Sequence, residues 1–129
     1  IEGRDIICQA VSGMGKTAVF VLTVLHNLGE NPDPCSALIM CHTRELAYQI
    51  KGEFTRLAKF IKNIRSEVIY GGEPLAKQQK MLKGANAPHI IVGTPGRILH
   101  LCKDKSINLD NLKMFILDEC DKVLENVSK

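Results

Sequence analysis

Residues 6–17, with the sequence IICQAVSGMGKT, give the clearest indication of the fold class. It begins with a short apolar run and ends in a glycine-rich segment, and residues 19–28 that follow it are rich in Val and Leu. An apolar run, a glycine-rich loop and a second apolar segment predict a strand, a loop and a helix in that order. An α/β domain with parallel strands is expected to begin in this way.

Four more apolar runs follow, with helical patterns between most of them. We expect strands at 36–41, 67–70, 88–92 and 114–117, and helices at 46–61, 74–82 and from 98 to about 102. The longest helical pattern repeats every three to four residues, which indicates one face packed on the core. Strands that alternate with helices predict a parallel α/β sheet with helices on both faces and right-handed crossovers. Residues 29–34 are expected to form a surface loop.

Length and composition suit one such domain. The chain has 129 residues, of which 45% are apolar and 24% charged, and this excludes a disordered or collagen-like chain. Its net charge of +3 is too small to identify a partner by charge alone. No apolar run approaches the roughly 20 residues that cross a bilayer, and the start lacks the features of a signal peptide, so we expect a soluble, intracellular protein. Five cysteines without a C-x-x-C pair are expected to be free thiols.

The segment after the first predicted strand fits the phosphate-binding loop, with Ala10 where the strict pattern has Gly. Gly13 and Gly15 permit backbone conformations in which successive N–H groups converge on phosphate oxygens, beside the positive end of a helix. Lys16 supplies a charge for the β- and γ-phosphates, and the Thr17 hydroxyl is a suitable ligand for Mg²⁺. The alternative is a glycine-rich turn with an exposed lysine. The predicted nucleotide-binding residues are Ala10, Val11, Ser12, Gly13, Met14, Gly15, Lys16 and Thr17.

A second signal lies near the other end of the chain, where the last predicted strand runs into Asp118 and Glu119. Asp118 is predicted to hold Mg²⁺ through water, and Glu119 to orient or deprotonate the water that attacks the γ-phosphate. The two acidic residues could instead cap the next helix, since Asp is a good N-cap. Together with Lys16 they predict a catalytic site for ATP and Mg²⁺ at the carboxyl edge of the sheet.

Residues 118–121, DECD, resemble the signature of the DEAD-box RNA helicases in its Cys-containing variant. The other motifs of that family occur in the family's order. Residues 10–17 resemble motif I, 42–47 (HTRELA) motif Ia, 71–72 the glycine doublet and 94–97 (TPGR) motif Ib. The resemblance therefore spans essentially the whole chain, and within the family it is greatest to the subgroup that acts in pre-mRNA splicing and mRNA nuclear export.

The resemblance implies that residues 1–129 are the first RecA-like domain, truncated at both ends, of an ATP-dependent RNA helicase. Members of the family close two RecA-like domains on ATP and RNA and separate duplexes locally. Asp121 resembles the acidic residue that couples hydrolysis to domain closure. The RNA backbone, single-stranded or in a duplex, is expected to be held without base-edge reading. The residues implied for this contact are Thr43, Arg44, Gly72, Thr94 and Arg97.

Simpler structural roles stay open for these residues. Arg44 and Glu45 suit the first turn of a solvated helix, and Asp121 suits a cap. The doublet at 71–72 could be only a turn, and the Pro-Gly pair at 95–96 only a helix start. His42 and Cys120 stand where most of the family has Pro and Ala, as they do in the splicing and export subgroup.

The resemblance also implies partners and a location. The partners are the second RecA-like domain of the same longer chain and factors of mRNA splicing and export, with no membrane involved. The location is the nucleus, and shuttling to the cytoplasm is left open. Without the second domain, which carries the arginine fingers, we expect weak nucleotide binding and almost no ATP hydrolysis. The alternatives are a DEAD-box helicase of translation or ribosome assembly, a non-helicase P-loop module acting on small molecules or in transport, and an adaptor whose nucleotide site serves assembly only.

Overall fold

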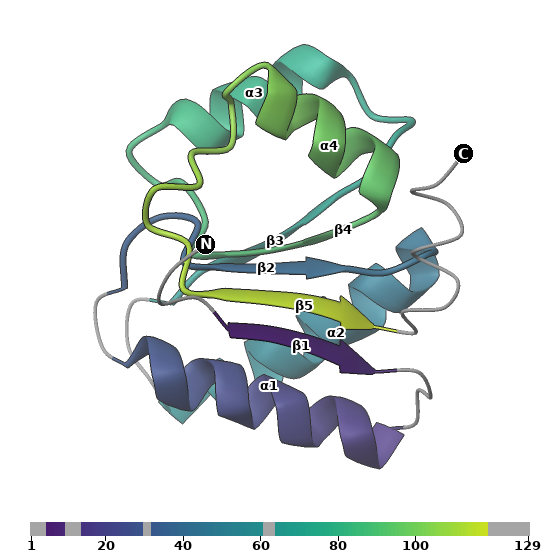
Figure 1. Ribbon diagram of the computed structural model, residues 1–129, viewed down its shortest axis with the longest axis vertical. Coiled ribbons are helices and arrows are strands. Elements are labelled where there is room, and N and C mark those ends of the chain that lie inside the picture. The colour runs from purple at the N-terminus through teal and green to yellow at the C-terminus, as the bar shows by residue number, and fades with distance from the viewer. Residues whose placement is uncertain (1–4, 10–13, 30–31, 61–63, 119–129) are drawn as a thin grey trace.

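The computed structural model describes residues 5–9, 14–29, 32–60 and 64–118. Over these residues strands alternate with helices (Figure 1). The strands are β1 (Asp5–Gln9), β2 (Ala37–Met40), β3 (Ser66–Ile69), β4 (Ile90–Gly93) and β5 (Met114–Asp118). The helices are α1 (Met14–Leu28), α2 (Arg44–Leu57), α3 (Leu75–Lys83) and α4 (Pro95–Lys103), and the 3₁₀ turn η1 (Ala58–Phe60) follows α2. None of the described helices is long and apolar enough to cross a membrane.

The strands form one parallel sheet in the order β1-β5-β2-β4-β3. Strand β5 lies between β1 and β2, so that Phe115 is the register partner of both Ile6 and Leu38. Helices α1 and α2 cover one face of the sheet, and α3 and α4 cover the other (Figure 1). The predicted parallel α/β sheet with helices on both faces is confirmed.

Alternation along each strand divides the core into two layers. Ala37 and Ile39 of β2 pack toward α1 and α2, whereas Leu38 and Met40 pack toward α3 and α4. Both sets are buried because the sheet is covered on both faces, and this explains why its strands are continuous apolar runs in the sequence.

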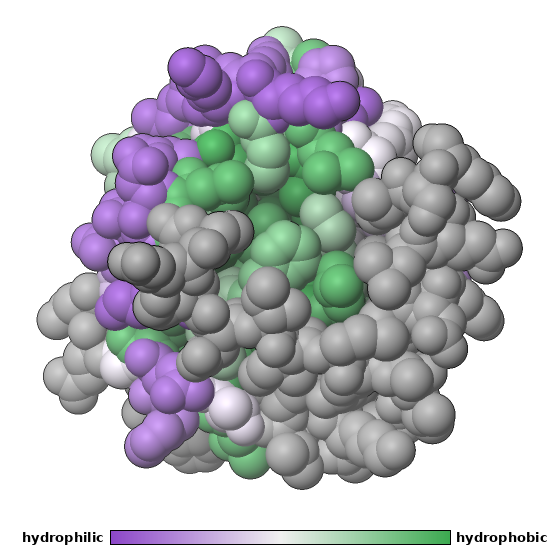
Figure 2. Space-filling model, in the orientation of Figure 1, coloured by the Kyte–Doolittle hydropathy of each residue, from purple (hydrophilic) through white to green (hydrophobic). Residues whose placement is uncertain are grey.

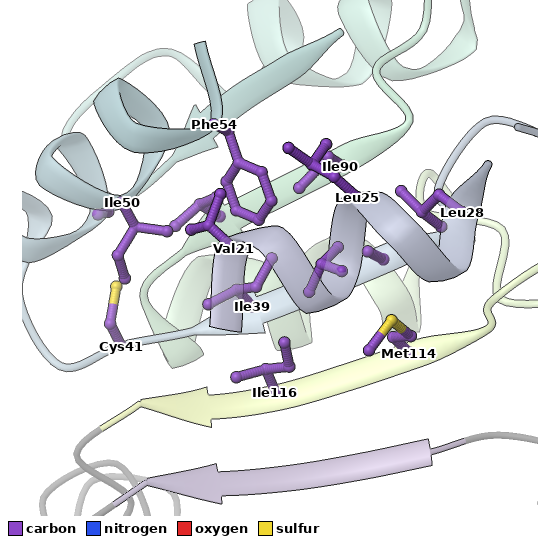
Figure 3. Close-up of a cluster of buried hydrophobic side chains, with 14 of the residues drawn as sticks. Val21, Leu25, Leu28, Ile39, Cys41, Ile50, Phe54, Ile90, Met114 and Ile116 are labelled. Carbon is purple, nitrogen blue, oxygen red and sulfur yellow. The ribbon is translucent and has the colours of Figure 1, made fainter. Parts of the chain in front are cut away.

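The layer under α1 and α2 is the one drawn in Figure 3. Apolar side chains from the two helices meet those of β2, β3, β4 and β5, and all of them are almost entirely buried. The helical stripe predicted along α2 therefore packs in the core, although Ile61 at its end lies outside the described residues. The side chains labelled there are Val21, Leu25, Leu28, Ile39, Cys41, Ile50, Phe54, Ile90, Met114 and Ile116.

The layer under α3 and α4 contains Ile69, Ile91, Ile98 and Leu101. On the face seen in Figure 1, apolar side chains gather below α4 and hydrophilic ones lie along the top (Figure 2). Both layers together anchor every described helix to the sheet, so the loops at the strand ends start from fixed positions.

One helix and one strand begin at different residues from those predicted, and in both cases a proline explains the difference. Helix α4 begins at Pro95 rather than Ile98, since Pro lacks an N–H and suits the first helical position. Strand β4 begins at Ile90 rather than Pro88, because Pro cannot donate to a strand ladder; its carbonyl instead accepts from the Cys35 N–H at 2.9 Å.

Candidate functional site

The carboxyl ends of β1 and β5 lie side by side. Gln9, the last residue of β1, is the register partner of Asp118, the last residue of β5. Helix α1 begins at Met14, so the backbone of Lys16 and Thr17 belongs to its first turn at the same edge. The predicted residues Ala10, Val11, Ser12, Gly13, Glu119 and Asp121 lie outside the described residues.

This arrangement fits the phosphate and metal chemistry expected from the sequence. A helix of 15 residues presents its first N–H groups and the positive end of its dipole at the strand ends. A carboxylate residue, Asp118, ends the strand next to the one that leads into that helix. The structure thus brings the two sequence signals to one edge of the sheet.

The residues predicted to contact RNA gather at the same edge of the sheet, on three neighbouring strands. Thr43 and Arg44 follow β2, Thr94 and Arg97 follow β4, and Gly72 follows β3. Since the sheet order is β2-β4-β3, the loop that carries Thr94 lies between the other two. The arrangement can form one continuous surface of backbone groups and cations.

Thr43 starts α2 as its N-cap. Its Oγ1 accepts a hydrogen bond from the Leu46 N–H at 3.1 Å, and its carbonyl accepts from the Ala47 N–H at 3.1 Å. The hydroxyl that could meet a ligand is therefore already used to cap the helix. The exposed Arg44 side chain lies beside it, with its guanidinium carbon 5.6 Å from the centroid of the Tyr70 ring.

Arg97 is held by two acceptors. Its Nη1 donates to the Glu73 carbonyl at 3.0 Å and to Oε1 of Gln78 at 2.8 Å. Gln78 in turn donates from Nε2 to the Tyr70 carbonyl at 3.1 Å and to Oε2 of Glu73 at 3.4 Å. The loop after β3 and the start of α4 are thereby joined through a single buried amide.

Sequence reasoning missed Gln78, which is only 2% exposed. One signal in the sequence could have found it. Leu75, Gln78 and Leu82 are spaced so that they lie on one face of α3, and Gln78 is the polar residue on that otherwise apolar face. A buried amide in such a place must find hydrogen-bond partners, and here its partners are the loop after β3 and Arg97 at the start of α4.

Two glycines shape the loops. Gly72 has φ = +110°, which is strained for residues with a side chain. At Gly93 a Cβ would overlap the Ile69 carbonyl oxygen and lie 2.9 Å from Cδ1 of Ile98. Next to it, the Thr94 N–H donates to the Ile69 carbonyl at 3.2 Å, so β3 and β4 end in close contact.

Both tyrosines of the chain meet beside these loops. The Tyr48 hydroxyl donates to the Tyr70 hydroxyl at 3.2 Å, which donates to Oε1 of Glu73 at 3.4 Å. The hydrogen bond with Tyr48, followed by burial and the charge of Glu73, raises the pKa of Tyr70 to about 12. Tyr70 is therefore neutral at physiological pH. The sequence did not single out either tyrosine.

Comparison with known proteins gives one family and consistent relatives. The family model described as DEAD/DEAH box helicase matches residues 1–129. The chain is 54% identical over 124 residues to a protein of Emericella nidulans named ATP-dependent RNA helicase sub2, covering 95% of this chain and 29% of that protein. It is 56% identical over 128 residues to ATP-dependent RNA helicase SUB2 of Phaeosphaeria nodorum, covering 97% of this chain and 29% of that protein.

Solved structures agree with the fold. The chain is similar to a DEAD box protein from the hyperthermophile Methanococcus jannaschii, with a TM-score of 0.81 and 44% identity over 96% of this chain and 33% of that one. It is also similar to the yeast DEAD-box splicing factor Prp28, with a TM-score of 0.77 and 28% identity over 95% of this chain and 30% of that one. The chain thus spans about a third or less of the proteins it matches.

Proposed function

The chain belongs to the DEAD/DEAH box helicase family, and we propose that it is the first RecA-like, ATP-binding domain of an ATP-dependent RNA helicase that acts in pre-mRNA splicing and mRNA nuclear export. The names of the fungal relatives, ATP-dependent RNA helicase sub2 and SUB2, support the helicase activity. The chain covers about 29% of each of those relatives. A protein of their length is long enough to contain a second RecA-like domain as well.

The pairing of Gln9 with Asp118 carries the proposal. It sets the strand that leads to the predicted phosphate loop beside the strand that ends in the acidic pair, as an ATP site requires. In this proposal the loop of residues 10–17 binds the phosphates through its N–H groups and Lys16, while Thr17 and Asp118 hold Mg²⁺. When bound, Mg²⁺ neutralises charge on the phosphate oxygens.

The remaining catalytic roles fall to the acidic residues after β5. Glu119 orients the attacking water and accepts its proton, and Asp121 couples hydrolysis to closure of the two domains. Each role follows from the match between this sequence and the family's motifs.

RNA binding is proposed for the three neighbouring loops. The N–H groups at the start of α2 and the guanidinium groups of Arg44 and Arg97 suit phosphate oxygens, and Thr94 and Gly72 complete the contact. The Arg97 side chain is already oriented by Gln78 and Glu73, which favours a fixed phosphate contact over a flexible one. Partners among splicing and export factors, and a nuclear location, complete the proposal.

Nucleotide chemistry and RNA action are tested by separate measurements. Calorimetric titration with Mg·ATP should show binding by this chain, loss of binding in Lys16→Ala, and retained binding in Glu119→Gln. After fusion to the family's second RecA-like domain, RNA should stimulate ATP hydrolysis, and Glu119→Gln should abolish it.

The outcomes distinguish the competing functions. Hydrolysis that RNA does not stimulate would indicate a P-loop module with another substrate. Nucleotide binding without any hydrolysis in the fused protein would indicate an adaptor. An inability of the unaltered chain to bind Mg·ATP at any concentration tested would refute the proposed ATP site.

A further inference from the structure

A cavity of about 290 Å³ opens beside the predicted RNA contacts, between α2 and α3 and next to β3. Tyr48 and Lys51 line it from α2, Lys77 and Met81 from α3, and Glu67 from β3. Its volume lies just below the usual range for small-ligand sites, about 300–1,000 Å³. A cavity of this size suits one ring system.

The Tyr48 ring forms an exposed aromatic wall of the cavity. The residue is 51% exposed, yet its ring lies edge-on to the Tyr70 ring, with the centroids 5.9 Å apart and the planes at 62°. The hydroxyl bond to Tyr70 fixes the ring further. An aromatic side chain that is both accessible and fixed can stack on a planar ligand with little loss of conformational entropy.

The charges around the cavity balance. Nζ of Lys51 lies 3.5 Å from a carboxylate oxygen of Glu67, and Nζ of Lys77 lies 3.9 Å from one of Glu73. Two cations with two carboxylates carry no net charge, so the rim does not favour a phosphate. The same groups offer donors and acceptors for the edge of an uncharged ring. This combination of an aromatic wall and a neutral, polar rim matches a nucleobase better than a phosphate.

The cavity shares its wall with the candidate RNA surface. Glu73 and Gln78, which line it, are the residues that hold Arg97. On the other side, Arg44 lies over Tyr70, which bonds Tyr48. A strand whose phosphates contact Arg44 and Arg97 therefore passes close to the cavity.

We propose that this cavity binds one base of single-stranded RNA, stacked on Tyr48, next to the strand whose backbone lies on Arg44 and Arg97. The inference rests on the proposed RNA-binding function and adds a base contact to it. Stacking of this kind is tolerant of sequence, because every base has a π-face.

The test compares the salt dependence of RNA affinity among matched variants. Fluorescence anisotropy with a short single-stranded RNA, between about 50 and 200 mM salt, measures the dissociation constant for the unaltered chain, Tyr48→Leu, Tyr48→Phe and Leu22→Ala. Leu22 is a suitable control because it is 53% exposed on α1, far along the chain from the cavity.

Tyr48→Leu should weaken binding about five- to tenfold, as expected for loss of one stacked base. The slope of log K against log salt should not change, because no phosphate contact is lost. Tyr48→Phe should stay within about twofold, since the ring remains, and Leu22→Ala should bind as the unaltered chain does. An RNA with abasic sites at every position should bind the unaltered chain and Tyr48→Leu equally.

Three results would overturn the inference while leaving the proposed function intact. They are equal RNA affinity for Tyr48→Leu and the unaltered chain, a smaller salt slope in Tyr48→Leu, and an effect of Tyr48→Leu that persists on abasic RNA. Equal RNA affinity of the two proteins would indicate that the cavity binds a protein partner instead of an RNA base. Failure of the unaltered chain to bind any RNA would instead refute the proposed function itself.

Discussion

Nη1 of Arg97 and Oε1 of Gln78 are joined by a hydrogen bond of 2.8 Å between two different helices, α4 and α3. The predicted phosphate-binding cation is thus oriented by a buried amide whose other hydrogen bonds go to the loop after β3. The orientation of Arg97 therefore depends on Gln78.

Gln78→Met should therefore affect both stability and RNA binding. Met has a similar length but leaves the Tyr70 carbonyl and Arg97 without this partner, and unpaired buried groups cost about 1–3 kcal/mol each. Urea unfolding should show a loss in that range, and RNA affinity should fall while Mg·ATP affinity stays. Gln49→Met, at an exposed position of α2, should change stability by less than about 0.5 kcal/mol.

Arg97→Ala should weaken RNA binding to a similar extent for any sequence. Loss of one phosphate contact should reduce the magnitude of the salt slope by about 0.7–0.9, the contribution of a single phosphate. Anisotropy titrations with several unrelated RNAs would measure both quantities. A selective loss with one RNA sequence would contradict the backbone contact proposed for Arg97.

Gly93→Ala should destabilise the fold, because its Cβ would overlap the Ile69 carbonyl oxygen. The oxygen belongs to backbone and cannot move aside cheaply, so we expect a loss of about 1–3 kcal/mol or more in the free energy of unfolding. Gly52→Ala is the matched control. A Cβ there meets nothing within 4 Å inside α2, and it should stabilise the protein by up to about 1 kcal/mol.

His89 should make stability depend on pH. Burial, and then the charge of Arg65, lowers the pKa of His89 from its ordinary value of 6.5, and Nδ1 accepts the Arg65 N–H at 2.9 Å. With a lowered pKa in the folded state, the unfolded chain binds more protons below about pH 6.5. The stabilising contribution is thus complete above that pH and decreases as the pH falls.

Urea unfolding of the unaltered chain and His89→Asn at several pH values would measure this effect. The Asn oxygen can still accept the Arg65 N–H but does not titrate, so the variant should lose less stability between pH 7 and pH 5. An identical decline in both proteins would show that His89 contributes nothing to the pH dependence.

The fold could be predicted from the sequence because its strands are buried on both faces. Runs such as Leu38 to Cys41 contain no polar residue, as is typical of parallel strands that are covered on both faces. The order of the strands could not be predicted in the same way. Placing β5 between β1 and β2 depends on packing between distant segments, which no local pattern in the chain encodes.

The candidate site likewise contains residues that the sequence predicts and residues that it does not. Lys16, Asp118, Thr43 and Arg97 lie in motifs whose spacing indicates phosphate chemistry, and the structure places their strands and loops at one edge. Gln78 and the tyrosine pair belong to no motif. Their importance comes from hydrogen bonds across 8 to 22 positions of the chain, which only the folded structure reveals.

The position of β5 has a consequence for synthesis on the ribosome. Strands β2, β3 and β4 can associate as soon as Gly93 has emerged, but β1 must wait for β5, since Asp5 pairs with Met114. This longest closure is also the slowest to form, because distant contacts cost the most chain entropy. Within residues 5–118, the edge proposed for nucleotide is therefore the last part of the sheet that synthesis can complete.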